Sequence, residues 1–251
     1  MAVISVDLAY VSYSDIGIAA LKYQDDKINV RFIRPQSPTG DPPEPKSLSH
    51  YLTDLCEQNG AGVLLIDGPQ AWKDPNNGLE HSRVCERILN TPAKTGLPGN
   101  VKPRNYQPFV SFSIQLFDCL HEIGWIRIDK KSIAEPSSRR FALESFPMAA
   151  WKSLTILPLP AKKKAHKHHL RDRLYVLKKL YPLVLNRDPN HDEIQALVAG
   201  LAGIAFEANR SDCYDLVGTE PRWVSGMCRE GYILLPRHPR HQSLGEVMHN
   251  V

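Results

Sequence analysis

The sequence predicts a single α/β domain in which helices pack against a mixed β-sheet. Three successive observations lead to this fold class: three strand-like segments at the N-terminus, a helical segment after them, and then the continuous apolar segment GVLLID, which begins at residue 62. Continuous apolar strands are typical of parallel strands that are covered on both faces. Because α/β domains often reach this size as one unit, we expect residues 1–251 to form a single domain.

The N-terminal strands are expected to form an antiparallel meander. Their residues favour β-structure, and Asp25 and Asp26 separate the second strand from the third, as in a hairpin turn. The apolar segment then supplies a fourth, buried strand. We expect these four strands at residues 2–10, 16–24, 27–35 and 62–70.

Helices are expected between and after the strands, because apolar residues recur there with helical spacing. Residues 71–107 differ: they combine a short helix with loops rich in Pro and Gly, and connections of this length are often functional. A stripe of small residues, Ala196, Ala199, Gly200 and Gly203, would allow the last helix to pack closely on the sheet. We expect helices at residues 47–60, 79–89, 109–124, 147–154, 166–181 and 189–210, strands at 125–129 and 140–146, and a small closing hairpin at 213–236.

Composition restricts the class of protein. A hydrophobic fraction of 42% with 23% charged residues is typical of a globular chain and excludes a disordered or collagen-like one. No run approaches the roughly 20 apolar residues of a membrane span, and the first residues lack a secretory signal pattern, so we expect a cytoplasmic protein without a membrane partner. The five cysteines include no CxxC pair and indicate neither a disulfide framework nor a zinc ribbon.

Two of the predicted strands contain a carboxylate near their ends, Asp7 in the first and Asp67 in the fourth. An unpaired carboxylate inside a sheet is costly unless it is neutralised, paired or bound to a cation. If these strands are neighbours, both side chains face the crevice where open α/β sheets bind ligands, and Asp192, in the first turn of the last helix, could reach the same place. Clustered oxygen ligands are what Mg²⁺ or Mn²⁺ requires, and such a site can activate water for phosphoryl chemistry.

Two of these carboxylates also have a structural interpretation. Asp67 precedes Gly68 and Pro69, so it can be an ordinary turn residue. Asp192 can interact favourably with the dipole of the helix that it begins. Asp7 is harder to explain in this way, because it interrupts an apolar run.

The order of motifs along the chain resembles one protein family. In succession come VDLAY, IDGPQ, RVCER, ESFPMAAWKSL, KHHLRDRLYVL, HDEIQALVAGLAG and GYILLP. This succession is similar to that of the domain-of-unknown-function 429 family, whose members are regarded as predicted nucleases with an RNase H-like fold. The resemblance spans almost the whole chain. It implies a mixed sheet of five strands, the first three antiparallel, and two-metal hydrolysis of phosphodiester bonds.

The resemblance also implies roles for individual residues. By position, Asp7, Asp67 and Asp192 match the family's metal-binding and catalytic carboxylates, and Glu144 matches a strand-end glutamate that lines the same site. Glu144 can instead bond backbone donors at the start of the next helix. Arg83 lies in the helix of the RVCER motif and is a candidate substrate-binding residue, with an i,i+3 ion pair to the glutamate of that motif as the alternative.

The chain departs from the family pattern at Gln195. Members of the family often carry a second aspartate there, one helical turn after the first, and Gln is a poor magnesium ligand. Glu193 lies about 100° away around the helix and is an uncertain substitute. The departure predicts a site that is weak, uses a single metal ion, or is inactive.

Residues 162–173, KKKAHKHHLRDR, concentrate positive charge at the start of a helix. Together with the net charge of +4, this segment is a candidate surface for the phosphates of DNA or RNA, although charge runs are more often solvated helix faces. Its three histidines are expected to spread their rings and to form no zinc site. The candidate substrate-binding residues here are Lys164, Lys167, Arg171 and Arg173.

Taken together, the observations predict a metal-dependent nuclease that uses Mg²⁺ or Mn²⁺ and a metal-bound water. The alternative is a catalytically degenerate protein on the same fold that binds nucleic acid or acts as a scaffold. An actin-like phosphotransferase would share the aspartate of the first strand, but such proteins need a Gly-rich phosphate loop and normally a duplicated domain, and the chain has neither.

Overall fold

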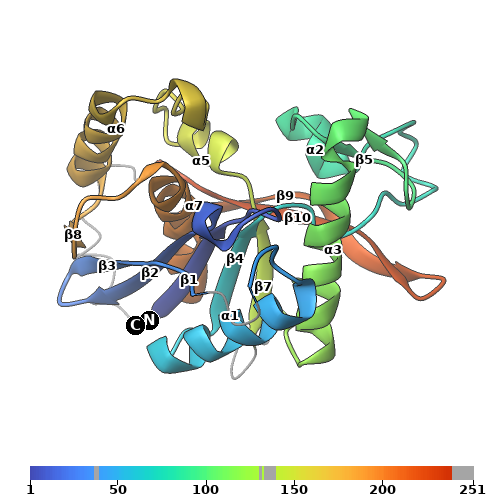
Figure 1. Cartoon of the computed structure of the whole chain (residues 1–251), viewed down its shortest axis with the longest axis horizontal. Helices are drawn as coiled ribbons and strands as arrows, with labels where there is room; N and C mark the ends of the chain where they lie inside the picture. The colour runs from blue at the N-terminus through green and yellow to red at the C-terminus, as the bar shows by residue number, and fades with distance from the viewer. Residues whose placement is uncertain (37–39, 130–131, 133–139, 239–251) are drawn as a thin grey trace.

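The central element of the structure is an eight-stranded mixed β-sheet (Figure 1). The structure is a computed structural model that describes residues 1–36, 40–129, 132 and 140–238. The strands lie in the order β8-β3-β2-β1-β4-β7-β10-β9. Their bounds are β1 Ala2–Asp7, β2 Gly17–Gln24, β3 Lys27–Ile33, β4 Val63–Asp67, β7 Phe141–Ser145, β8 Leu183–Leu185, β9 Tyr214–Val224 and β10 Met227–Pro236.

The strand directions confirm the predicted mixed α/β sheet. β1, β2 and β3 form an antiparallel meander, and β4 lies parallel to β1 on its other side. β7 continues in parallel beside β4. The carboxyl ends of β1, β4 and β7 therefore meet at one edge of the sheet.

The expected number of five strands is wrong, because three further strands extend the sheet. β9 and β10 form an antiparallel hairpin, and β10 pairs in parallel with β7, so the hairpin joins the sheet. β8 pairs with β3 at the opposite edge, and its three residues are too few to show a β-pattern in the sequence. Residues 125–129, expected to be a strand, contribute only the isolated bridge between Ile126 and Phe141.

Helices cover both faces of the sheet and divide the core into two layers. On one face, α5, α6 and α7 bury apolar side chains against strand residues such as Val3 and Leu65. On the other face, α1 and α3 pack against residues such as Ile4 and Ile66. The α-helices are α1 Pro45–Asn59, α2 Val84–Leu89, α3 Gln107–Glu122, α5 Pro147–Ser153, α6 Lys167–Leu180 and α7 His191–Glu207, and the 3₁₀ helices are η1 Tyr13–Asp15, η2 Arg104–Tyr106 and η3 Lys162–Lys164.

None of the helices in the described ranges is long and apolar enough to cross a membrane.

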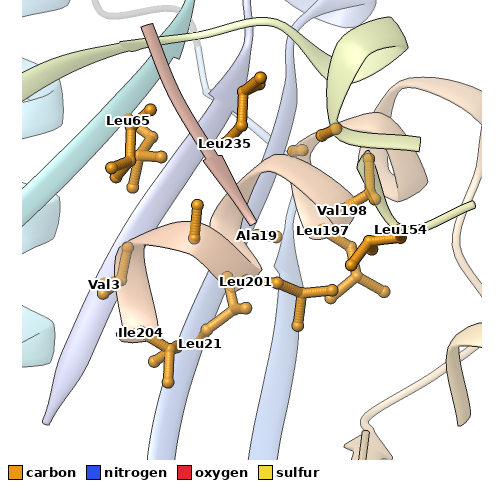
Figure 2. Close-up of a cluster of buried hydrophobic side chains, with 14 of the residues drawn as sticks. Val3, Ala19, Leu21, Leu65, Leu154, Leu197, Val198, Leu201, Ile204 and Leu235 are labelled. Atoms are coloured by element: carbon orange, nitrogen blue, oxygen red, sulfur yellow. The ribbon is translucent and has the colours of Figure 1, made fainter. Parts of the chain in front are cut away.

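Helix α7 packs closely on β1, β2 and β4 because glycines face these strands. A Cβ atom added at Gly200 would lie 2.6 Å from Cδ1 of Leu21, and one added at Gly203 would lie 2.4 Å from Cδ1 of Leu65. Figure 2 shows Leu201 of this helix among side chains of the strands. The small-residue stripe therefore brings α7 close to the sheet.

The segment expected to be rich in loops, residues 71–107, contains short elements of its own. Besides α2 and η2, the strands β5 (Lys94–Thr95) and β6 (Val101–Lys102) pair in a separate two-stranded sheet. α2 contacts β9 and β10. The segment thus lies over the C-terminal hairpin, next to the carboxyl end of β7.

Enlarging Gly203 is expected to destabilise the fold. Gly203→Val places methyl groups where Leu65 and Val3 already lie, and overpacking of this kind costs about 1–3 kcal/mol. Urea denaturation should show this loss in the free energy of unfolding, with Ala205→Val, at a half-buried position of the same helix, as the control. A Gly203→Val variant as stable as the wild type would contradict the described packing.

Candidate functional site

Asp7 and Asp67 end two adjacent parallel strands and lie side by side. β1 and β4 pair in register, with Asp7 opposite Asp67. Because side chains alternate along a strand, Asp7 points to the same face as Val3, and Asp67 to the same face as Leu65; this is the face that α7 covers. A side-chain hydrogen bond links the two carboxyl groups, and both residues remain partly exposed.

Helix α7 brings a third carboxylate to this pair. Asp192 lies in the first turn of α7, and this turn packs against Gly17, the β2 residue that pairs with Asp7. A Cβ atom at Gly17 would lie 2.3 Å from the carbonyl carbon and from the carbonyl oxygen of Asp192. Only glycine allows so close an approach, and it brings Asp192 near enough to Asp7 for their charges to interact.

The density of negative charge changes the protonation of the pair. Burial, together with the charges of Asp67 and Asp192, holds the pKa of Asp7 well above its usual range. Burial also raises the pKa of Asp67 to about 7, in spite of the hydrogen bond from Asp7, and the nearby charge of Glu144 adds to this rise. Near neutral pH the two carboxyl groups therefore retain a shared proton unless a cation neutralises them.

Lys162 is a residue of the site that sequence reasoning missed. Its ammonium donates to Asp192 at 2.5 Å and to Asp15 at 2.9 Å. Partial burial opposes ionisation, but these hydrogen bonds raise the pKa of Lys162, so the ammonium stays charged. The ring of His191 lies 3.2 Å from the other oxygen of Asp192. Burial alone would raise the pKa of Asp192, but the hydrogen bonds with His191 and Lys162 outweigh burial and lower this pKa.

Gln195 and Glu193 are engaged in structural contacts. Trp151 Nε1 donates to Gln195 Oε1 at 2.6 Å, which joins α5 to α7. Glu193 pairs with Arg187 and accepts the backbone N–H of Asn190 at 2.8 Å, which completes the N-terminal cap of α7. Neither residue adds a carboxylate to the pair of Asp7 and Asp67.

The donor set at the strand ends fits one divalent cation. Asp7 and Asp67 supply two adjacent, partly exposed carboxylates, and no basic residue that the structure describes forms a salt bridge with either of them. Ser145 lies opposite Asp67 on β7, and its buried hydroxyl has no hydrogen-bond partner among the described residues; such an orphaned group marks a place for a water or a ligand. Asp192, the third expected ligand, is held by Lys162.

The described residues do not bring three metal ligands together. Within the residues that the structure describes, no group of three or more His, Cys, Asp or Glu side chains is arranged to hold a metal ion. The three expected metal ligands thus divide into a pair, Asp7 and Asp67, and a neighbour, Asp192, that is bound to a lysine. A cation at the pair would have to draw its other ligands from water or substrate.

Glu144 lies beside Asp67 but faces away from the pair. It precedes Ser145 on β7, so strand alternation directs its side chain to the opposite face of the sheet. There Arg83 Nη1 and Nη2 each donate to one Glu144 oxygen at 2.7 Å. Burial raises the pKa of Glu144 even though Arg83 opposes this rise. Arg83 therefore holds the side chain of Glu144 away from the pair, and only the charge of Glu144 acts on Asp67. The structure does not bring Glu144 together with the pair, as its expected catalytic role would require.

Arg83 is only 1% exposed. Besides Glu144, its guanidinium binds Glu86 at 3.0 Å, so the expected i,i+3 ion pair is present. A guanidinium that is buried and held on both sides cannot reach the phosphate of an external substrate. These contacts assign Arg83 to the structure of the protein, and substrate binding by Arg83 stays an expectation that they do not support.

Two further buried carboxylates hold the segment 71–107 in place, Glu86 within the segment and Glu230 from β10. Glu86 accepts the backbone N–H of Thr95 at 2.8 Å. Glu230, on β10, accepts the backbone N–H groups of Asp74 at 3.0 Å and Val84 at 2.9 Å. The sequence marks Glu86 through its motif, but sequence reasoning did not find Glu230, because the backbone donors that it bonds lie far from it along the chain.

The basic residues expected to bind substrate have different environments. Lys164 ends η3 and is exposed. Arg173 donates to the carbonyl of Leu157 and so holds α6 to the preceding loop. Lys167 and Arg171 are exposed and line a groove on α6.

The histidines of the basic segment do not spread their rings as expected. The ring centroids of His166, His168 and His169 lie 4.0 to 5.7 Å apart. The reason is the turn into α6, where His169 accepts the backbone N–H of His166. This cluster still does not meet the geometry of a metal site in the part of the chain that the structure describes.

Without a divalent cation, the protein is expected to lose stability as pH rises from about 4 to about 7. The pKa of Asp67 is higher in the folded protein, about 7, than in the unfolded chain. Folding therefore binds a proton in this pH range, and stability falls by on the order of 3 kcal/mol across it. Asp67→Asn removes this penalty, so in EDTA it should be more stable than the wild type at pH 8 and nearly equal to it at pH 4.

Urea denaturation at both pH values measures this difference. Asp54→Asn, at an exposed position on α1, is the control and should follow the wild type. If Asp67→Asn also followed the wild type at both pH values, Asp67 would not be protonated near neutral pH.

Comparisons of the chain with protein-family models, with curated proteins and with solved structures give no match. The family resemblance therefore rests on the motifs of the sequence alone. What the site does has to be inferred from its own geometry.

Proposed function

We propose that the protein is a metal-dependent nuclease with an RNase H-like fold, a hydrolase of phosphodiester bonds in nucleic acid. The observation that carries the proposal is the pair of Asp7 and Asp67, two adjacent carboxylates with raised pKa values and partial exposure. A divalent cation would resolve this unbalanced charge. The central strands, in the order β3-β2-β1-β4-β7, support the proposal because they correspond to the five-stranded sheet that the resemblance implies.

Asp7 and Asp67 would hold one Mg²⁺ or Mn²⁺ ion. When bound, the ion supplies Lewis-acid stabilisation of the phosphoryl group and lowers the pKa of water. Lys162 supplies a second positive charge, which Asp15 and Asp192 hold in place. Its ammonium can bind a phosphate oxygen and stabilise the charge that develops there, a role that a second metal ion has in two-metal sites.

This arrangement uses one metal ion, whereas the resemblance implies two. Gln195 replaces the aspartate that would bind the second ion, and its amide is engaged by Trp151. The same observation favours a second candidate function, a catalytically degenerate protein that binds nucleic acid without cleaving it. The two candidates share the cation at Asp7 and Asp67 and differ in whether phosphodiester bonds are broken.

Cleavage of labelled single-stranded, duplex and branched DNA and RNA tests the nuclease proposal. With Mg²⁺ or Mn²⁺ the wild type should cleave at least one of these substrates. Asp7→Asn should lose activity by about 100-fold or more, because it removes a metal ligand. Asp54→Asn, on the opposite face of the sheet, should cleave like the wild type.

Mn²⁺ binding, measured by calorimetry in parallel, separates the candidate functions. We expect one Mn²⁺ ion per wild-type chain and none for Asp7→Asn.

The variant Lys162→Met should bind Mn²⁺ more tightly, on the order of tenfold, because the ammonium no longer repels the ion or occupies Asp192. The control is Lys163→Met, which changes an exposed neighbouring lysine.

A wild type that binds Mn²⁺ and nucleic acid but cleaves nothing would contradict the nuclease and support the second candidate. A wild type that binds no Mn²⁺ would contradict the metal site itself.

A further inference from the structure

A groove on the surface of α6 combines positive charge with apolar surface. Its volume is about 750 Å³, which lies within the range of ligand-binding sites. One wall is formed by α6, and the other by Asp188 and Pro189 in the segment that leads into α7. The wall on α6 carries Lys167, Arg171 and Lys178 together with Leu170, Leu174 and Tyr175.

The three cations of the groove are available to bind an anion. Lys167, Arg171 and Lys178 are exposed, and their spacing of four and seven residues places them on one face of α6 along about 16 Å of helix. Asp188 is the single carboxylate among the lining residues. None of the three cations forms a salt bridge with a residue that the structure describes. The groove therefore has a net positive charge that a polyanion would complement.

Tyr175 gives the groove an aromatic surface. It is 60% exposed, although a large apolar ring on a helix surface is usually turned toward the core. The ammonium of Lys179 lies 4.4 Å from the ring centroid and covers one side of the ring. The rest of the ring can stack on a planar group of a ligand.

A short stretch of chain connects one wall of the groove to the candidate site. Asp188 and Pro189 come directly before Asn190, which caps α7, and Asp192 is in the first turn of that helix. Four residues of chain span at most about 14 Å, so the wall of the groove ends within this distance of Asp192. From the other side, Lys162 at the start of η3 binds Asp192 directly.

We propose that this groove binds single-stranded nucleic acid and leads it to the carboxylates at the strand ends. The inference deepens the proposed function and rests on it for the chemistry of the ligand. A row of cations with an interleaved aromatic ring is the combination by which proteins hold single strands, with the cations on phosphates and the ring on an unpaired base. In a duplex the faces of the bases are stacked on one another, so Tyr175 and the leucines beside it would have no planar partner.

Fluorescence anisotropy tests the inference with labelled oligothymidine, oligouridine and a DNA duplex of the same length. The measurements are made in EDTA, so that no metal-dependent cleavage takes place. The wild type should bind the single strands more tightly than the duplex, and three phosphate contacts should give a slope of about −2 for log K against log salt concentration.

Variants of the groove identify the contacts. Arg171→Glu should weaken binding of the single strands about tenfold, through the lost contact and the added repulsion. Tyr175→Leu should weaken it about fivefold or more, whereas Tyr175→Phe, which keeps the ring, should bind like the wild type. Lys46→Glu makes the same charge change at an exposed position on α1, on the other face of the sheet, and should have little effect.

The outcomes separate this inference from the nuclease proposal. If the groove variants bind single strands as well as the wild type does, or if the duplex binds as tightly as the single strands, the inference is overturned. If binding follows the expected pattern but the wild type cleaves nothing with Mg²⁺ or Mn²⁺, the groove is supported and the nuclease proposal fails.

Discussion

The parallel register of β1 and β4 places the carboxylates of Asp7 and Asp67 side by side, and the surrounding structure depends on how their charge is balanced. Two adjacent carboxylates at the ends of central strands cannot both ionise without a large cost in free energy. Gly17 increases this cost, because it admits the first turn of α7 and with it Asp192. Lys162 bonds Asp192 and Asp15, and its charge offsets the raised pKa of Asp7 only in part. The remaining imbalance at Asp7 and Asp67 is what a divalent cation would remove.

The charges of three other buried acids of this protein are balanced by hydrogen-bond partners. Glu144 has a bidentate partner in Arg83, and Glu86 and Glu230 accept backbone N–H groups. Buried charges are normally paired in this way, because an unpaired charge is strongly destabilising. The carboxylates of Asp7 and Asp67 differ, because they bond each other and form no salt bridge with a basic residue that the structure describes. Perturbed acids in an accessible position are typical of active sites, which supports the proposed function.

Much of the fold could be predicted because it is encoded in local patterns. The antiparallel strands and the continuous apolar strand ending at Asp67 follow directly from residue alternation and burial, and Gly200 and Gly203 marked the face of α7 that meets the sheet. The edge strands could not be predicted as members of the sheet. β8 is too short to show a pattern, and the addition of β10 beside β7 depends on tertiary packing.

The site was predictable only in part, for a related reason. A carboxylate at a strand end is visible in the sequence, so Asp7 and Asp67 could be named. The partner of a long, flexible side chain is not visible: the contacts of Lys162 with Asp192 and of Arg83 with Glu144 join segments 30 and 61 residues apart. These contacts decide which basic residues face a ligand and which support the structure.

The most direct test of the central claim is a pH titration of the aspartate carboxyl carbons by ¹³C NMR, with and without Mg²⁺. Without Mg²⁺, the Asp67 signal should titrate near pH 7, and Asp7 should also titrate well above the ordinary range of an aspartate. With saturating Mg²⁺, both carboxyl groups should be ionised at neutral pH, because the cation stabilises the charged forms. Ordinary titration of both residues near pH 4, unchanged by Mg²⁺, would contradict the account.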